Sequence, residues 1–170
     1  SAGTSVLIWD GWRKVLLGLA FSSVLGGLAG LMLMTAIYWL FRNKKPARMR
    51  GKFRVMQIFS SLFMAFSHGS NDGQKFMGVF SLALLLGGIL PEFRIPLWVI
   101  LLCAAVMALG TLTGGWRIIR TMGMKLTKLE THQGFAAEVA AATTIEIATH
   151  FGVPLSTTHT ITSSIVAGKR

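Results

Sequence analysis

The chain has 170 residues, of which 52% are hydrophobic and only 14% are charged, whereas soluble domains average about 25% charged residues. Its net charge of +11 would suit a nucleic-acid-binding protein, but the basic residues gather at the ends of apolar segments, as they do in the cytoplasmic loops of membrane proteins. The composition therefore disfavours an ordinary soluble domain and a nucleic-acid-binding protein, and it indicates an integral membrane protein. The single cysteine, Cys103, excludes a disulfide framework.

The first predicted membrane span covers residues 15–41, a nearly uninterrupted apolar run. A helix of that length crosses a hydrocarbon core of about 30 Å with some tilt. Trp12 and Trp39 flank the run, as aromatic side chains do at the edges of a bilayer. Small residues recur at every fourth position, which predicts a helix face for close packing. They are Gly18, Ser22, Gly26 and Gly30.

A basic loop is predicted next, over 42–54 on the cytoplasmic side. The apolar segments that follow, 53–66 and 76–90, are separated by the polar segment 67–75. Each apolar segment would be about 20–24 Å long as a helix, which is short for a full crossing. We therefore expect 53–90 to form one crossing broken at 67–75, or a re-entrant arrangement.

Two further membrane segments complete the chain. A short turn at 91–96 precedes a span over 97–116, and a second cytoplasmic basic stretch covers 117–128. The last region, 133–168, is interrupted by Gly-Val-Pro at 152–154, so we expect a second broken hairpin there. The predicted fold is all-α and integral to the membrane, with transmembrane helices plus two discontinuous or re-entrant helical hairpins. Such interrupted segments mark the binding site in many transporters.

The polar segment 67–75 combines side chains that can bind an anion and a cation. If the chain leaves the helix at Gly69 and Gly73, a second half-helix starts near Asp72 and presents N–H groups and its positive dipole end to an anion. Lys75 adds a positive charge, while the Asp72 carboxylate and nearby backbone carbonyls suit a cation. Further polar groups come from His68, Ser70, Asn71 and Gln74.

The second interruption repeats this logic without a charged donor. Pro154 suits the start of a helix, so the hydroxyl and N–H groups that follow it would face an oxyanion. These groups belong to Ser156, Thr157 and Thr158, and His159 comes next. In the preceding segment Glu138 is flanked by alanines, and we expect it to be buried, whereas Glu146 suits either a buried position or the end of a span.

Several stretches resemble one transporter family. FSHGSNDGQKFMG at 66–78 and GVPLSTTHTITSSIVAG at 152–168 look like the second-half signatures of the inorganic phosphate transporter (PiT) family. Segments 11–22, 115–129 and 134–145 are also similar to family segments, so the resemblance covers nearly the whole chain in order. The family's first-half signature, a glycine-rich Asn-Asp-x-Ala-Asn-Ala stretch, is absent. The resemblance is therefore to the C-terminal half, the second of two inverted repeats.

This resemblance implies a secondary transporter that moves inorganic phosphate with H⁺ or Na⁺ across the plasma or inner membrane. The chain would be a fragment of a multi-pass protein that needs its N-terminal repeat as a partner and is able to form a homodimer in the lipid bilayer. The implied phosphate ligands are Asn71, Asp72, Gln74, Lys75, Ser156, Thr157 and Thr158. The implied coupling-ion ligands are Asp72, Glu138 and Ser70, with His68 and His159 in support. The resemblance implies no catalytic residue and no cofactor other than Na⁺ as coupling ion.

The residues leave two choices open. Asp72, Glu138 and backbone carbonyls suit either H⁺ or Na⁺ as the coupling ion. Sulfate or another oxyanion is the alternative cargo, although phosphate keeps an acidic proton at neutral pH and a carboxylate acceptor therefore favours phosphate over sulfate. An intramembrane metalloenzyme using His68, Asp72 and His159 is disfavoured, because the histidines lack the spacing typical of zinc sites.

Overall fold

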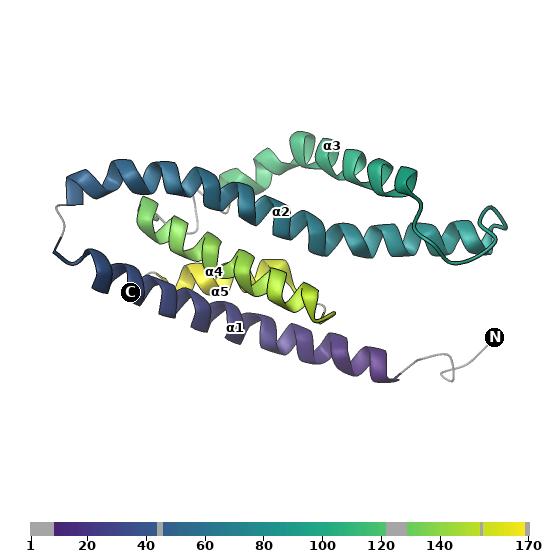
Figure 1. Ribbon diagram of the computed structural model, residues 1–170, viewed down its shortest axis with the longest axis horizontal. Coiled ribbons are helices and arrows are strands. Elements are labelled where there is room, and N and C mark those ends of the chain that lie inside the picture. The colour runs from purple at the N-terminus through teal and green to yellow at the C-terminus, as the bar shows by residue number, and fades with distance from the viewer. Residues whose placement is uncertain (1–8, 44–45, 122–128, 154, 169–170) are drawn as a thin grey trace. The chain divides into compact units, whose positions relative to one another are not determined.

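The computed structural model describes residues 9–43, 46–121, 129–153 and 155–168, and its regular structure there is helical throughout. The helices are α1 (Trp9–Phe41), α2 (Pro46–Leu86), α3 (Leu97–Thr121), α4 (Thr131–His150) and α5 (Thr157–Ala167) (Figure 1). Two segments, Gly11–Phe41 and Leu97–Trp116, are long and apolar enough to cross a membrane. The predicted all-α class is confirmed, and both spans lie where the sequence predicts them.

The described residues divide into two compact units. The first contains α1, α2 as far as His68, α4 and α5, and the second contains α2 from Gly69 together with α3. In the first unit α4 and α5 lie beside α1 and beside each other (Figure 1). Its apolar core has two clusters, one around Met34, Phe53 and Ala136 and the other around Met64, Ala141, Ala142 and Ile145.

The small-residue stripe of α1 forms the seam with α5. Gly18, Ser22, Gly26 and Gly30 are all buried. The Ser164 hydroxyl on α5 donates a hydrogen bond of 2.7 Å to the Gly26 carbonyl on α1. A Cβ atom added at Gly30 would lie 2.7 Å from the Ser164 carbonyl oxygen, closer than a side chain can approach. The packing predicted for this face is confirmed, and its partner is the last helix of the chain.

The predicted interruption within 133–168 is confirmed. Helix α4 is alanine-rich, which favours helix, and a capping box between Glu130 and Gln133 stabilises its start. It ends at His150, and Gly152 follows with a φ of +65°, a conformation that costs glycine little. Helix α5 then begins at Thr157. Pro154, which we expected to open the second half-helix, lies outside the described residues.

The predicted break at 67–75 is wrong for this structure, because α2 runs without interruption from Pro46 to Leu86. Gly69 and Gly73 each cost a helix only about 1 kcal/mol relative to alanine, and the sequence has no proline between Pro46 and Pro91 to stop it. A salt bridge of 2.9 Å between Lys75 and Asp72, three residues apart within one turn of the helix, favours its continuation.

The predicted basic loops also differ from the structure. Most of 42–54 is helical, because α2 begins at Pro46, where proline suits the first turn of a helix. The second basic stretch, 117–128, is divided: α3 continues to Thr121, and residues 122–128 lie outside the described residues. Charge alone marks the ends of membrane spans and does not distinguish a loop from a further helical turn.

The second unit joins α3 to the last part of α2. The Phe80 and Trp98 rings meet edge to face with their centroids 6.1 Å apart, and Val99 is fully buried. Residues 87–96 connect the two helices without helical structure, and Gly88 there has a φ of +72°. This non-helical connection includes the turn predicted at 91–96.

Candidate functional site

The polar residues 68–75 lie on consecutive turns of α2. Asn71 is 5% exposed, whereas His68, Gln74 and Lys75 are exposed and Ser70 is half-buried. The Lys75 ammonium donates a hydrogen bond of 2.9 Å to the Asp72 carboxylate, which is the more buried of the two side chains. Because α2 is continuous, it offers no helix N-terminus to an anion here. The segment instead presents the ion pair of Asp72 and Lys75, whose charges cancel, next to the buried side-chain amide of Asn71.

The start of α5 places the predicted oxyanion donors at the N-terminus of a helix, as the sequence predicts. Ser156 caps the helix, and its hydroxyl oxygen accepts the His159 N–H at 3.4 Å. The same oxygen lies 2.7 Å from His159 Nδ1, so the exposed imidazole is held against the cap. Thr157 is buried and Thr158 is exposed. The first turn of a helix leaves N–H groups without intrahelical partners and carries the positive end of the dipole, so this end suits an anion.

Glu138, which we expected to be buried, is half-buried in the structure, because its carboxylate is partly open to solvent. It projects from α4 and accepts hydrogen bonds at both oxygens from α2, at Oε1 from the Ser61 hydroxyl at 2.9 Å and at Oε2 from the Ser60 hydroxyl. The buried Ser60 hydroxyl also lies 3.0 Å from the Gln57 carbonyl. Since hydroxyls both donate and accept, two serines and a carboxylate provide an oxygen-rich group that can bind a proton or a small cation.

Ser60 and Ser61 were not predicted from the sequence. They stand as a pair within the apolar run 53–66, where serine commonly bonds to its own helix backbone. The Ser60 contact with the Gln57 carbonyl is of that local kind, but the contacts of both serines with Glu138 join residues more than seventy positions apart. The available signals in the sequence were this pair of adjacent hydroxyl side chains in an apolar run and, far along the chain, a glutamate flanked by alanines.

Replacing Ser60 with alanine is expected to destabilise the first unit by about 1.5–3 kcal/mol, because a half-buried carboxylate loses a hydrogen-bond donor. Thermal unfolding of the intact protein in detergent measures this. Thr35→Ala is the matched control, since Thr35 is exposed and its hydroxyl donates to the Leu31 carbonyl of its own helix. If Ser60→Ala and Glu138→Gln act additively when combined, the two side chains are not coupled.

Glu146 occupies a different face of α4. It lies two turns beyond Glu138 and is offset from it by about 80° around the helix. It is half-buried, and within the described part of the chain its Oε2 atom is buried without a hydrogen-bond partner. The sequence suits either a buried position or the end of a span for Glu146, and in the structure this side chain is half-buried.

The structure groups the predicted residues into three local sets. Glu138 lies with Ser60 and Ser61, and Ser156 lies with His159, both in the first unit. The third set belongs to the second unit and consists of Ser70, Asn71, Asp72, Gln74 and Lys75. His68 is the last residue of α2 that belongs to the first unit.

The chain is similar to known phosphate transporters. A model of the Phosphate transporter family matches residues 1–168. A protein of Rhizobium meliloti named "Probable low-affinity inorganic phosphate transporter" is 44% identical over 165 residues, which cover 96% of this chain and 49% of that protein. A protein of the same name from Bacillus subtilis is 35% identical over 98% of this chain and 50% of its own length. The chain spans about half the length of these relatives.

A solved structure gives the same picture of the fold. The structure titled "The sodium-dependent phosphate transporter" superposes with a TM-score of 0.83 over 98% of this chain and 59% of its own, at 21% sequence identity. This likeness shows that the chain has the all-α fold of that structure.

Proposed function

The chain belongs to the phosphate transporter family, and we propose on this premise that it supplies part of a membrane carrier that moves inorganic phosphate together with H⁺ or Na⁺. Its relatives are transporters rather than enzymes, and this chain is not an enzyme. Under this proposal it forms the second repeat of a multi-pass protein, with its basic segments 42–54 and 117–128 on the cytoplasmic side.

The start of α5 is the observation on which the proposal depends most. Ser156, Thr157 and Thr158 bring hydroxyl groups to the N-terminal turn of a helix in a membrane protein. Such a turn can stabilise an anion through its N–H groups and dipole without a lysine or arginine. A carrier must also release its cargo, and donors without a full charge are suited to binding that is not too tight for release.

The ion pair on α2 suggests how phosphate and cation binding are linked. Lys75 is bonded to Asp72 in this structure. An arriving phosphate that attracts Lys75 would leave the Asp72 carboxylate without this cation, and the carboxylate would then take up H⁺ or Na⁺ in its place. Asn71 and Gln74 would add amide donors to the phosphate. Under this scheme each ligand strengthens the binding of the other, which is the requirement for symport.

Glu138 provides a second carboxylate for the coupling ion. Its two serine contacts give it donors when it is ionised and acceptors when it is protonated or when a cation lies nearby. Ser70 is the further proposed oxygen ligand, and on the continuous α2 it faces a different side of the helix from Asp72, two residues on. The proposed coupling-ion ligands are therefore Asp72 and Ser70 in the second unit and Glu138 in the first, where Ser60 and Ser61 contact it.

Uptake of radiolabelled phosphate by the intact protein in proteoliposomes tests this function. We expect accumulation when one gradient, of H⁺ or of Na⁺, is imposed and only slow equilibration when neither is present. The gradient that drives uptake identifies the coupling ion. Folded protein that takes up sulfate under the same gradients, with phosphate failing to compete, would contradict the proposal and assign a different oxyanion.

A further inference from the structure

A cavity of about 680 Å³ opens in the first unit, where α1 ends and where α2 and α4 begin. Pockets for small molecules have volumes of about 300–1,000 Å³, so this one can hold more than a bare ion. It is separate from the groups assigned to phosphate and the coupling ion, none of which lines it. The lining residues used below are Tyr38, Phe41, Arg42, Arg50, Phe53 and His132.

Aromatic rings form the frame of the cavity. The Phe41 and Phe53 rings meet edge to face with centroids 5.4 Å apart, and Tyr38 meets the His132 ring in the same way at 5.8 Å. Phe53 also lies 6.0 Å from His132. Because these contacts join α1, α2 and α4, they hold the apolar wall in place and give it a defined shape.

The charge at the rim is positive. Arg42 and Arg50 both line the cavity and are exposed, and the Arg42 guanidinium stacks 5.8 Å from the centre of the Trp39 ring. Glu130 is the acidic residue of the lining, and among the described residues its ion-pair partner is His132, at 3.3 Å. Two guanidinium groups are therefore available to an anion, and arginine is well suited to the oxygens of a phosphate group.

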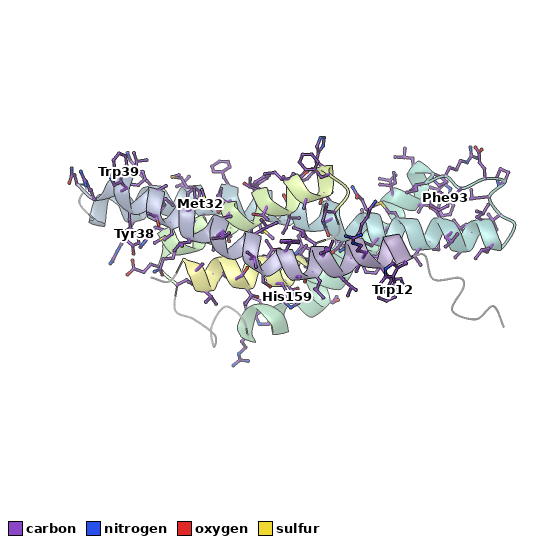
Figure 2. The ribbon with its side chains drawn as sticks, turned by 90° about the horizontal axis from the view of Figure 1, so that it is seen from below. Trp12, Met32, Tyr38, Trp39, Phe93 and His159 are labelled. Atoms are coloured by element: carbon purple, nitrogen blue, oxygen red, sulfur yellow. The ribbon has the colours of Figure 1, made fainter. Side chains whose placement is uncertain are left out.

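The aromatic residues of α1 lead us to place the cavity at the level of the lipid headgroups. Tyr38 and Trp39 mark one end of α1 and Trp12 the other (Figure 2), and tyrosine and tryptophan concentrate at the two interfaces of a bilayer. Basic pockets between helices at this level commonly accept phosphate-bearing lipid headgroups. An amphiphilic ligand would use both parts of the lining, whereas a free phosphate ion would use only the arginines.

We propose that this cavity binds an anionic phospholipid, with its phosphate between Arg42 and Arg50 and its glycerol and upper acyl chain against the aromatic wall. The lipid would join the start of α2 to the end of α1 and the start of α4. The inference does not depend on which ion the protein carries, because it uses none of the transport residues.

Lipid-dependent thermal unfolding of the intact protein in dodecyl maltoside tests the proposal. Added phosphatidylglycerol is expected to raise the midpoint temperature in a saturable way, and phosphatidylcholine is not. In the variant Arg42→Gln/Arg50→Gln we expect the apparent affinity for phosphatidylglycerol to fall at least about tenfold, since two charge-assisted contacts are lost. Arg94→Gln is the matched control, because Arg94 is exposed in the connection at 87–96 and does not line the cavity.

Three results would overturn the assignment. The double variant could keep the wild-type response to phosphatidylglycerol, phosphatidylcholine could stabilise the protein equally, or inorganic phosphate at millimolar concentration could reproduce the effect and identify a free-anion site instead. Arg50→Gln alone guards against loss of folding, because it leaves the Arg42 contact with Trp39 intact. It should weaken the lipid response to an intermediate extent, and native mass spectrometry should show fewer retained phosphatidylglycerol molecules.

Discussion

Asp72→Asn is expected to lower cation-coupled phosphate uptake by about 10- to 100-fold, the loss that follows when a charge-assisted contact worth about 1.5–3 kcal/mol is removed. Asparagine keeps the shape of the side chain but can neither accept a proton nor balance a cation. It also removes the salt-bridge partner of Lys75. Initial rates of radiolabelled phosphate uptake into proteoliposomes under imposed H⁺ and Na⁺ gradients measure the effect.

An exchange assay separates loss of coupling from loss of the whole site. Phosphate-for-phosphate counterflow needs no ion gradient, so it reports cargo binding and movement alone. Glu92→Gln is the matched control, because Glu92 is an exposed acidic residue in the connection at 87–96 of the same unit. Uptake at the wild-type rate in folded Asp72→Asn protein would remove Asp72 from the mechanism.

Gly30→Ala is expected to destabilise the first unit by about 1–3 kcal/mol, the usual cost of overpacking a close contact. The added methyl group would lie 2.7 Å from the Ser164 carbonyl oxygen and 2.8 Å from its Cα atom. Both atoms belong to the backbone of α5, so no side chain can rotate away and the helices must separate. Thermal unfolding in detergent, with the yield of monodisperse protein beside it, measures the loss.

Gly27 offers the control for this prediction on the same helix. A Cβ atom there would lie 3.8 Å from Ser163 Cβ, an ordinary van der Waals distance. Gly27→Ala should therefore be neutral or stabilise α1 by up to about 1 kcal/mol, since alanine favours helix over glycine. Equal destabilisation by both substitutions would show that the effect does not arise at the seam with α5.

The sequence was most informative where a short stretch of chain decides the structure. Gly152 and Pro154 are local signals, and the interruption between α4 and α5 was predicted from the stretch that contains them. In α2, by contrast, glycines and polar side chains were interpreted as a break, yet they only weaken a helix and do not end it. Signals that forbid helix therefore predicted better than signals that merely disfavour it.

Contacts between distant residues were harder to predict. The stripe on α1 indicated close packing, but nothing in its spacing names α5, whose Ser164 is 138 residues away from Gly26. The contacts of Ser60 and Ser61 with Glu138 likewise join residues that are far apart in the sequence and that no local pattern pairs. The type of group at the site could be predicted from residue chemistry, and the pairing of those groups depends on tertiary packing.

The neutral pair on α2 has an electrical consequence. Asp72 and Lys75 lie within one turn and cancel each other's charge, so a displacement of this segment along the membrane normal moves almost no net charge. A lone charge crossing the membrane would gain or lose about 2.3 kcal/mol for every 100 mV of membrane potential. The resting voltage of the cell would thus do little work on the segment itself and, under the proposed function, would act instead on the net charge of the phosphate and cation.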